Sequence, residues 1–162
     1  MASTTAQRVT PFLWFADRAE EALNFYKSIF KDAEITGVQR LPAEAKGKEG
    51  RMLTATFRLN GLEFMILEGG PMFEFTPAIS FFVHCKTQEE VDHFWDGLGE
   101  GGKYIQCGWL TDKFGITWQI VPDALGRLMG DPNRAKAKAV QEAMMKMGKI
   151  VIAELEAAYE KG

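Results

Sequence analysis

The polar residues of this sequence that could do chemistry are few, and the most conspicuous lies in an apolar strand. Gln119 stands between Trp118 and Ile120 in the run ITWQIV. A neutral amide can both donate and accept hydrogen bonds, so it can orient a ligand as well as bond to neighbouring backbone. The residue type alone leaves Gln119 a candidate for catalysis, for ligand contact or for a purely structural role.

Two further side chains, His84 and Cys107, have the chemistry of a base and of a nucleophile. A neutral imidazole can act as a general base or bind a ligand oxygen. A cysteine attacks as the thiolate and so needs a lowered pKa, for which the sequence shows no neighbouring base. Each has a structural alternative, an ordinary strand-end histidine and an unreactive thiol. The sequence therefore names candidates but no established catalytic residue.

Strand alternation groups some of these residues on one face. In the run AISFFVHC, Ser80, Phe82 and His84 point to one side, and Phe81, Val83 and Cys85 point to the other. The first three side chains can therefore contribute to one site.

The composition excludes several classes of function. The chain has 162 residues, 46% hydrophobic and 25% charged, with a formal charge of -3. Because Lys and Arg are scattered among Asp and Glu, the positive stripe that binds phosphates is absent, and we expect no nucleic-acid partner. No apolar run approaches the length of about 18 residues that spans a bilayer, so we expect no membrane role.

The N-terminal residues and the cysteines indicate a cytoplasmic protein. The start MASTTAQRV lacks the charged segment and apolar core of a signal peptide. In a reducing compartment Cys85 and Cys107 are expected to be free thiols, because neither a CxxC pair nor a Cys/His cluster is present.

These residues must be positioned by strands and helices that occur twice in the same order. In the first half, VTPFLWF reads as a strand and AEEALNFYKSIF as a helix. The polar stretch GVQRLPAEAKGKEG reads as a loop that includes part of a strand. It is followed by TATFRLNGLEFMIL, where Asn60-Gly61 predicts a tight hairpin because both residues tolerate positive φ.

The second half repeats this order. AISFFVHC is the strand, TQEEVDHFWDGL the helix ending at glycines, and a second hairpin through Lys113-Phe114-Gly115 leads into ITWQIV. The halves align with Phe12 on Phe81 and with Gly61–Ile66 on Gly115–Ile120. This predicts an α+β fold of two modules, at about residues 8–70 and 77–122, whose sheets curl around a shared cleft. The alternative is a single α+β domain whose elements resemble each other by chance.

The modules define a domain over residues 1–130, in which 122–130 is a loop, and a C-terminal helix follows over 131–162. Asp131-Pro132 is typical of a helix start. An apolar stripe then predicts one long amphipathic helix, which packs on its own domain or on a dimer partner. The stripe consists of Val140, Met144, Met147, Val151 and Leu155.

Taken in this order, the motifs resemble the vicinal oxygen chelate superfamily, which includes glyoxalase I, bleomycin-resistance proteins and extradiol dioxygenases. The resemblance is greatest to the PhnB-like group that is often labelled 3-demethylubiquinone-9 3-methyltransferase domain. The motifs are TPFLWFADRAEEALNFYKSIF, GLEFMILEGGPMFEFTPAISFFVHCKTQEEVDHFW, CGWLTDKFGITWQIVP and the tail AMMKMGKIVIAELEAAY. The resemblance implies two βαβββ modules forming an incomplete barrel around a central cleft, in a homodimer.

Metal-dependent members of the superfamily carry a His or Gln on the first strand of each module and a Glu on the last. Carried over, these positions fall at Thr10 or Pro11, at Ile79 or Ser80, and at Met65 and Gln119. A divalent ion needs three or four His, Glu, Asp or Cys ligands, and this set does not provide them. We therefore expect no metal and no other cofactor. The methyltransferase label is also unsupported, because the run GEGG follows a helix, whereas a nucleotide-binding turn follows a strand.

The sequence thus predicts a protein that binds a small hydrophobic or aromatic molecule between aromatic side chains. The expected ligand contacts are Gln119, Ser80, Phe82, Met65 and His84, and Met144, Met145 and Met147 could close over the ligand. Two alternatives remain open. One is an enzyme, either a metal-dependent lyase or dioxygenase or the methyltransferase of the label. The other is an interaction protein that uses its C-terminal helix.

Overall fold

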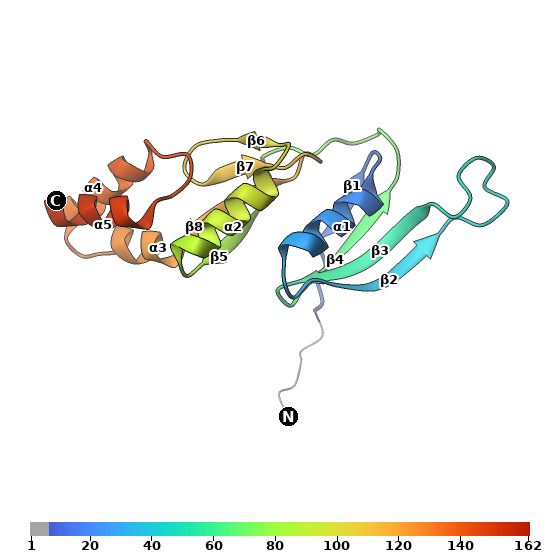
Figure 1. Ribbon diagram of the computed structural model, residues 1–162, viewed down its shortest axis with the longest axis horizontal. Coiled ribbons are helices and arrows are strands. Elements are labelled where there is room, and N and C mark those ends of the chain that lie inside the picture. The colour runs from blue at the N-terminus through green and yellow to red at the C-terminus, as the bar shows by residue number, and fades with distance from the viewer. Residues whose placement is uncertain (1–6) are drawn as a thin grey trace, which may run out of the picture. The chain divides into compact units, whose positions relative to one another are not determined.

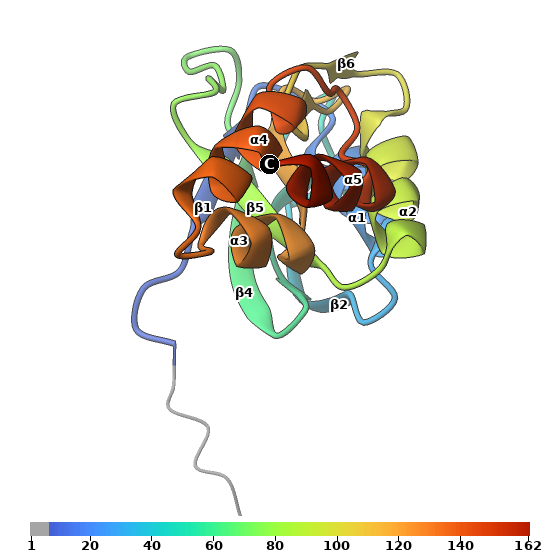
Figure 2. The same cartoon turned by 90° about the vertical axis from the view of Figure 1, so that its left-hand side faces the viewer.

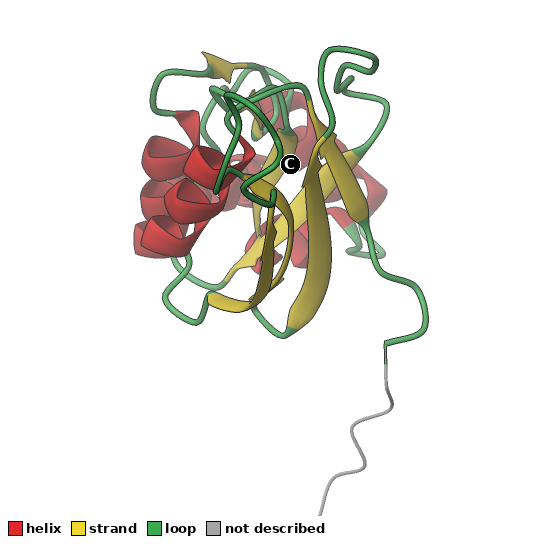
Figure 3. Ribbon diagram, turned by 90° about the vertical axis from the view of Figure 1, so that its right-hand side faces the viewer, coloured by secondary structure: helices red, strands yellow, loops and turns green. Residues whose placement is uncertain are grey.

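The computed structural model describes residues 7–162 and divides the chain into two units. One unit ends at Glu74, and the other runs from Phe75 to Gly162. Each unit contains one four-stranded sheet. In both, helices and strands form separate layers (Figure 3). The predicted α+β class with two modules is confirmed.

The first unit has the order strand, helix and three strands (Figure 1). Its sheet order is β1-β4-β3-β2, in which β1 and β4 are parallel and the other pairs antiparallel. Helix α1 packs on β3 and β4 and buries Leu23 and Tyr26 against that face. The bounds are β1 Phe12–Phe15, α1 Ala19–Ile29, β2 Glu34–Arg40, β3 Met52–Leu59 and β4 Leu62–Glu68.

The turn between β3 and β4 is the hairpin predicted from Asn-Gly. Asn60 has φ of 48° and Gly61 has φ of 80°, the left-handed conformations that a two-residue turn of this type requires. This prediction is confirmed.

The second unit repeats the module and adds three helices. Its sheet order is β5-β8-β7-β6, with β5 and β8 parallel, and α2 packs on β5, β7 and β8. The module bounds are β5 Ser80–Cys85, α2 Gln88–Gly99, β6 Lys103–Tyr104, β7 Trp109–Thr111 and β8 Thr117–Pro122. The added helices are α3 Asp123–Met129, α4 Arg134–Met144 and α5 Ile152–Lys161.

The registers of the parallel strands show which residues of the two modules are equivalent. Met65 of β4 lies opposite Phe12, and Gln119 of β8 lies opposite Phe82. Phe12 therefore corresponds to Phe82, and its predicted alignment with Phe81 is wrong by one residue. The cause is the connection from strand to helix, which is one residue shorter in the second module.

The predicted second hairpin is also present, and a buried carboxylate organises it. Oδ1 of Asp112 accepts hydrogen bonds from the backbone N–H groups of Phe114, at 2.9 Å, and Ile116, at 3.1 Å. Oδ2 accepts from the indole N–H of Trp118 at 2.9 Å. Asp112 is 3% exposed, so these donors replace the water that the charge loses on burial.

The C-terminal segment differs from its prediction in two ways. Residues 123–129 form α3 instead of a loop, and one long helix is replaced by α4 and α5, joined by residues 145–151 (Figure 2). The three helices pack in cis on the end of β8. They share an apolar core made of Val121, Leu125, Leu128, Val140, Met147, Ile150 and Leu155.

No helix in the described part of the chain, residues 7–162, has the length and apolar character to cross a membrane.

Candidate functional site

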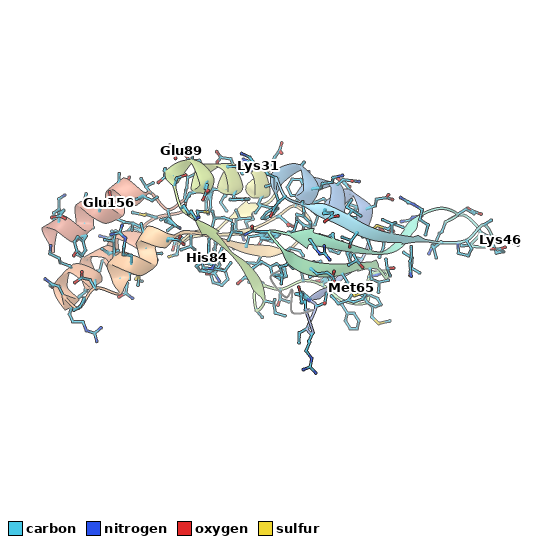
Figure 4. All side chains as sticks on the ribbon, turned by 90° about the horizontal axis from the view of Figure 1, so that it is seen from below. Lys31, Lys46, Met65, His84, Glu89 and Glu156 are labelled. Atoms are coloured by element: carbon cyan, nitrogen blue, oxygen red, sulfur yellow. The ribbon has the colours of Figure 1, made fainter. Side chains whose placement is uncertain are left out.

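The face of the second sheet opposite α2 carries the residues that alternation predicted. Phe82 is 48% exposed there, and His84 projects on the opposite side of the sheet from Glu89 of α2 (Figure 4). Trp118 and Ile120 of β8 point the other way and are buried under α2. The predicted grouping of Ser80, Phe82 and His84 on one face follows from their registers with Thr117, Gln119 and Val121.

A groove of about 550 Å³ lies between this face and the C-terminal helices, wholly within the second unit. A volume of this size is typical of a small-molecule site. The sheet supplies both aromatic and polar groups, and α3 and α4 supply mainly apolar ones. The lining residues are Phe82, His84, Cys107, Trp109, Gln119, Val121, Pro122, Asp123, Leu125, Gly126, Met129 and Met144.

Gln119 is held by Ser80 at the base of this face. Its side-chain amide donates a hydrogen bond to the Ser80 hydroxyl at 2.9 Å, between strands β8 and β5. A primary amide has two N–H donors and two acceptor lone pairs, so one bond leaves capacity for a ligand. Ser80 therefore acts on the groove through Gln119 and is not itself a lining residue.

His84 lies beside an acidic residue at the edge of the groove. Its Nδ1 atom is 3.6 Å from Oδ1 of Asp123, the first residue of α3, and its ring centroid is 4.7 Å from that of Phe82. The side chains of His84 and Asp123 are 76% and 57% exposed, so water screens their attraction. The arrangement offers a polar group at the open side of an apolar groove.

The two cysteines have different surroundings. Burial raises the pKa of Cys85 to about 12, which leaves it a thiol at neutral pH. Cys107 lines the groove, is partly exposed and has φ of 59°. Its backbone N–H donates to the carbonyl of Met147 at 2.8 Å, which fixes its position against the segment between α4 and α5.

The remaining predicted contacts are Met65 and three methionines of the C-terminal segment. Met65 belongs to the first unit, where it lies on the sheet face opposite α1 (Figure 4). Of the three methionines expected to close over a ligand, Met144 lines the groove, Met147 is buried in the C-terminal core, and Met145 is 57% exposed.

The chemistry of the side chains does not suit a divalent cation. Within residues 7–162, no three His, Cys, Asp or Glu side chains are grouped as metal ligands would be. Of the positions carried over from the superfamily, Ser80 is hydrogen-bonded to Gln119, and Thr10 lies two residues before Phe12 as Ser80 lies two residues before Phe82. The amide of Gln119 is already directed at the hydroxyl of Ser80. A hydroxyl, a thioether and an amide are poor ligands for a catalytic metal.

Sequence reasoning missed the part of the groove that α3 provides, namely Asp123, Leu125, Gly126 and Met129. These residues are predicted from the sequence to form a loop. The signal that could have revealed a helix is the apolar spacing of Leu125, Leu128 and Met129 after the acidic Asp123.

Comparisons with known proteins agree with this fold. Residues 7–121 match the model of a family described as 3-demethylubiquinone-9 3-methyltransferase. A PhnB protein from Bacillus cereus, described provisionally by the same activity, is 41% identical over 72% of this chain and 99% of its own, with a TM-score of 0.67. None of the curated proteins matches the sequence.

Two more distant structures share the fold. Protein PA1353 from Pseudomonas aeruginosa is 18% identical over 72% of this chain and 98% of its own, with a TM-score of 0.62. The fosfomycin resistance protein FosX from Listeria monocytogenes, solved with Mn(II) and sulfate, is 19% identical over 70% of this chain and 88% of its own, with a TM-score of 0.52.

The paired βαβββ modules are a fold shared with FosX, as the resemblance to the vicinal oxygen chelate superfamily implies. The chain belongs to the PhnB-like family described as 3-demethylubiquinone-9 3-methyltransferase. The match to the family model ends at residue 121, so the tail that had been included in the resemblance lies outside the matched region.

Proposed function

We propose that this protein binds a small hydrophobic or aromatic molecule in the groove of its second unit, without a metal ion. The observation that carries the proposal is the composition of the groove. Phe82 and Trp109 present aromatic surface, Met129 and Met144 present flexible apolar surface, and Gln119 offers a neutral hydrogen-bonding group. Burial of a flat apolar molecule is favourable in such a site, and one polar group fixes its orientation.

The lining favours binding over acid–base or nucleophilic chemistry. A catalytic nucleophile and its base must lie within hydrogen-bond reach, with a third group orienting the base. Here the group that would orient a base is too far away, because Nδ1 of the exposed His84 is 3.6 Å from Oδ1 of Asp123, beyond hydrogen-bond distance. His84 and Cys107 are therefore proposed as ligand contacts rather than as a catalytic pair.

The direct test is a ligand screen with a site-specific readout. We would titrate the protein with 4-alkylphenols, naphthols and short-chain quinones, and measure binding by calorimetry and by the rate of Cys107 alkylation. A ligand in the groove should slow modification of Cys107 severalfold. Cys85 is the internal control, because it is buried and should not react in the folded protein with or without ligand.

Binding without protection of Cys107 would place the ligand elsewhere and contradict the proposal. Absence of binding across all three compound classes would also contradict it.

A second candidate function is supported by the name of a relative. The Bacillus cereus protein, 41% identical, is described provisionally as a 3-demethylubiquinone-9 3-methyltransferase, and a demethylubiquinone is a flat apolar molecule. The sequence around Gly99–Gly102 does not fit the methyl donor, since α2 ends there and Gly101, with φ of 71°, follows its C-cap. Two measurements test this function. The first is calorimetry of the protein with S-adenosylmethionine, and the second is mass spectrometry of a demethylubiquinone incubated with the protein and S-adenosylmethionine. Methylated product would replace the binding proposal with an enzymatic one.

We also propose a cytoplasmic homodimer, which the superfamily resemblance supports. Light scattering coupled to size-exclusion chromatography should give twice the mass of the 18.2 kDa chain, and a monomer at all concentrations would contradict it.

A further inference from the structure

The residues beyond the family region provide much of the groove. The family match ends at residue 121, and α3, α4 and α5 follow it. Leu125, Gly126 and Met129 of α3 and Met144 at the end of α4 line the side of the groove that faces the sheet. We call these four residues the helical wall. The strands of the family region supply the opposite side, including Phe82, Trp109 and Gln119.

The helical wall is fixed to the module by specific contacts. The backbone N–H groups of Cys107 and Gly108 donate to the carbonyls of Met147 and Gly148, at 2.8 and 2.9 Å. These carbonyls belong to the segment that directly follows Met144. The position of Met144 over the groove is therefore coupled to the loop that carries Cys107.

A second set of contacts ties the same segment to α2. The amide of Gln88 donates to the carbonyl of Ile150 at 3.1 Å and accepts from the N–H of Ile152 at 2.8 Å. The ammonium of Lys149 lies 3.2 Å from Asp92 and 3.1 Å from Asp96. These bonds give the segment between α4 and α5 a defined position, which a wall that discriminates between ligands requires.

The side chains of the wall have a distinctive chemistry. Met129 and Met144 are partly buried and pack against the C-terminal core. Unbranched, polarizable thioethers adapt to flexible apolar groups, whereas the aromatic residues across the groove suit a flat ring.

We propose that residues 123–162 are the specificity element of the groove, and that Met129 and Met144 select a ligand whose aromatic ring carries an unbranched apolar chain. The inference rests on the proposed binding function. The ring lies against Phe82 and Trp109, and the chain extends toward the helical wall, whose methionines set the length it accommodates.

The experiment uses the full-length protein and 4-alkylphenols with chains from methyl to octyl. Wild-type affinity should rise about fourfold for each added methylene until the chain meets the wall, and then fall. Met144→Ala removes three heavy atoms, so the preferred chain should lengthen by about two to three carbons. Met129→Ala should lengthen it as well, and provides the same test if Met144→Ala folds poorly.

Met145→Ala is the matched control. Met145 is the next residue, is 57% exposed and does not line the groove, so its removal should leave the preferred chain length unchanged. Thermal unfolding of each variant separates a change in preference from a loss of folding.

The outcomes separate this inference from the function it rests on. If the variants keep the wild-type chain preference while Phe82→Ala still weakens binding, the groove binds ligand but the wall does not select it, and the inference is overturned. An equal shift in Met145→Ala would overturn it too. If no 4-alkylphenol binds to the wild type or protects Cys107, both the inference and the binding of alkylphenols in the groove fail.

Discussion

The two modules have the same strand order but differ in what their turns, caps and open faces contain. Phe12 and Phe82 occupy equivalent positions opposite Met65 and Gln119, and both phenylalanines are about half exposed, at 51% and 48%. In the second unit, α3 and α4 follow the module and make its open face one side of a groove. The comparison shows that strand order alone does not make a site, which depends on the segments added around the sheet.

The largest expected difference between the modules is the contribution of their hairpins to stability. The first hairpin closes with Asn60-Gly61, whereas the second depends on the buried Asp112 and its three donors. Asp112→Ala leaves those donors without their acceptor and should lower the free energy of unfolding by about 3 kcal/mol. Urea unfolding at neutral pH measures the change.

Asn60→Ala is the counterpart in the first module and should cost about 1 kcal/mol, because alanine disfavours positive φ. Equal losses for the two variants would show that Asp112 adds nothing beyond turn geometry.

The equivalent phenylalanines give the next largest effect. Phe82 lines the groove and Phe12 does not, so Phe82→Ala should weaken a phenol or naphthol ligand about tenfold. Phe12→Ala is matched in residue type, strand position and exposure and should leave affinity within twofold. Calorimetric titration of both variants tests this. Similar losses in both would mean that the ligand also depends on the first module.

The helix starts offer a smaller effect. Helix α2 begins with two side-chain caps: Thr87 at the N-cap accepts from the N–H of Glu90 at 3.2 Å, and Glu90 accepts from the N–H of Lys86, the residue before the N-cap, at 2.6 Å. Helix α1 has no such residue. There Arg18 has φ of 59°, and Glu68 of β4 accepts from the N–H of Ala19 at 3.0 Å.

Thr87→Ala should therefore lower the free energy of unfolding by about 1 kcal/mol, and Thr87→Ser should restore most of it. Calorimetric melting of both variants gives the difference. No loss in Thr87→Ala would indicate that tertiary packing alone holds the start of α2.

The smallest expected effect is a pH dependence from one pair in the C-terminal segment that only the second unit has. The N–H of Asn133 and the hydroxyl of Tyr159 hold the pKa of Asp131 below its usual value. Because the pKa of Asp131 is lower in the folded protein than in the unfolded chain, Asp131 stabilises the folded protein at pH values above its unfolded pKa, near 4. This stabilisation is lost as the pH falls through the folded pKa.

Asp131 in turn raises the pKa of Tyr159, so that contribution is present below about pH 10 and is lost as the pH rises through the folded pKa. Tyr159→Phe removes the hydrogen bond between the two side chains. The melting temperature of this variant should therefore depend slightly less on pH than that of the wild type, both in acid near the pKa of Asp131 and in alkali near that of Tyr159. An unchanged profile would show that solvent screens the pair completely.

Local sequence signals predicted the modules well because hairpins and helix faces are encoded by neighbouring residues. Asn60-Gly61 determines its turn through φ alone, and the alternation of Ser80, Phe82 and His84 needs only the strand period. The alignment of Phe12 was wrong by one residue because the connection from strand to helix differs in length between the modules. That difference becomes apparent only when each first strand is paired with its parallel partner.

The C-terminal segment could not be predicted in the same way. Val140, Met147 and Leu155 are all buried, as one helical stripe requires, yet two helices and the segment that joins them bury the same positions. The break occurs where the carbonyls of Met147 and Gly148 bond to Cys107 and Gly108, about 40 residues earlier in the sequence. This long-range contact lies just beyond the end of α4 and close to Met144, so the placement of that part of the helical wall had no local signal.

The central position of strand β8 determines how fast its backbone amides exchange with solvent. The strand lies between β5 and β7, with Trp118 and Ile120 buried under α2 and Val121 buried in the C-terminal core. Amide hydrogens in a strand that is paired on both sides and packed under a helix exchange slowly, because they open only when a large part of the unit unfolds. We expect the amides around Gln119 to be among the slowest to exchange in the second unit, so that the hydrogen-bonding group of the groove belongs to one of its least mobile strands.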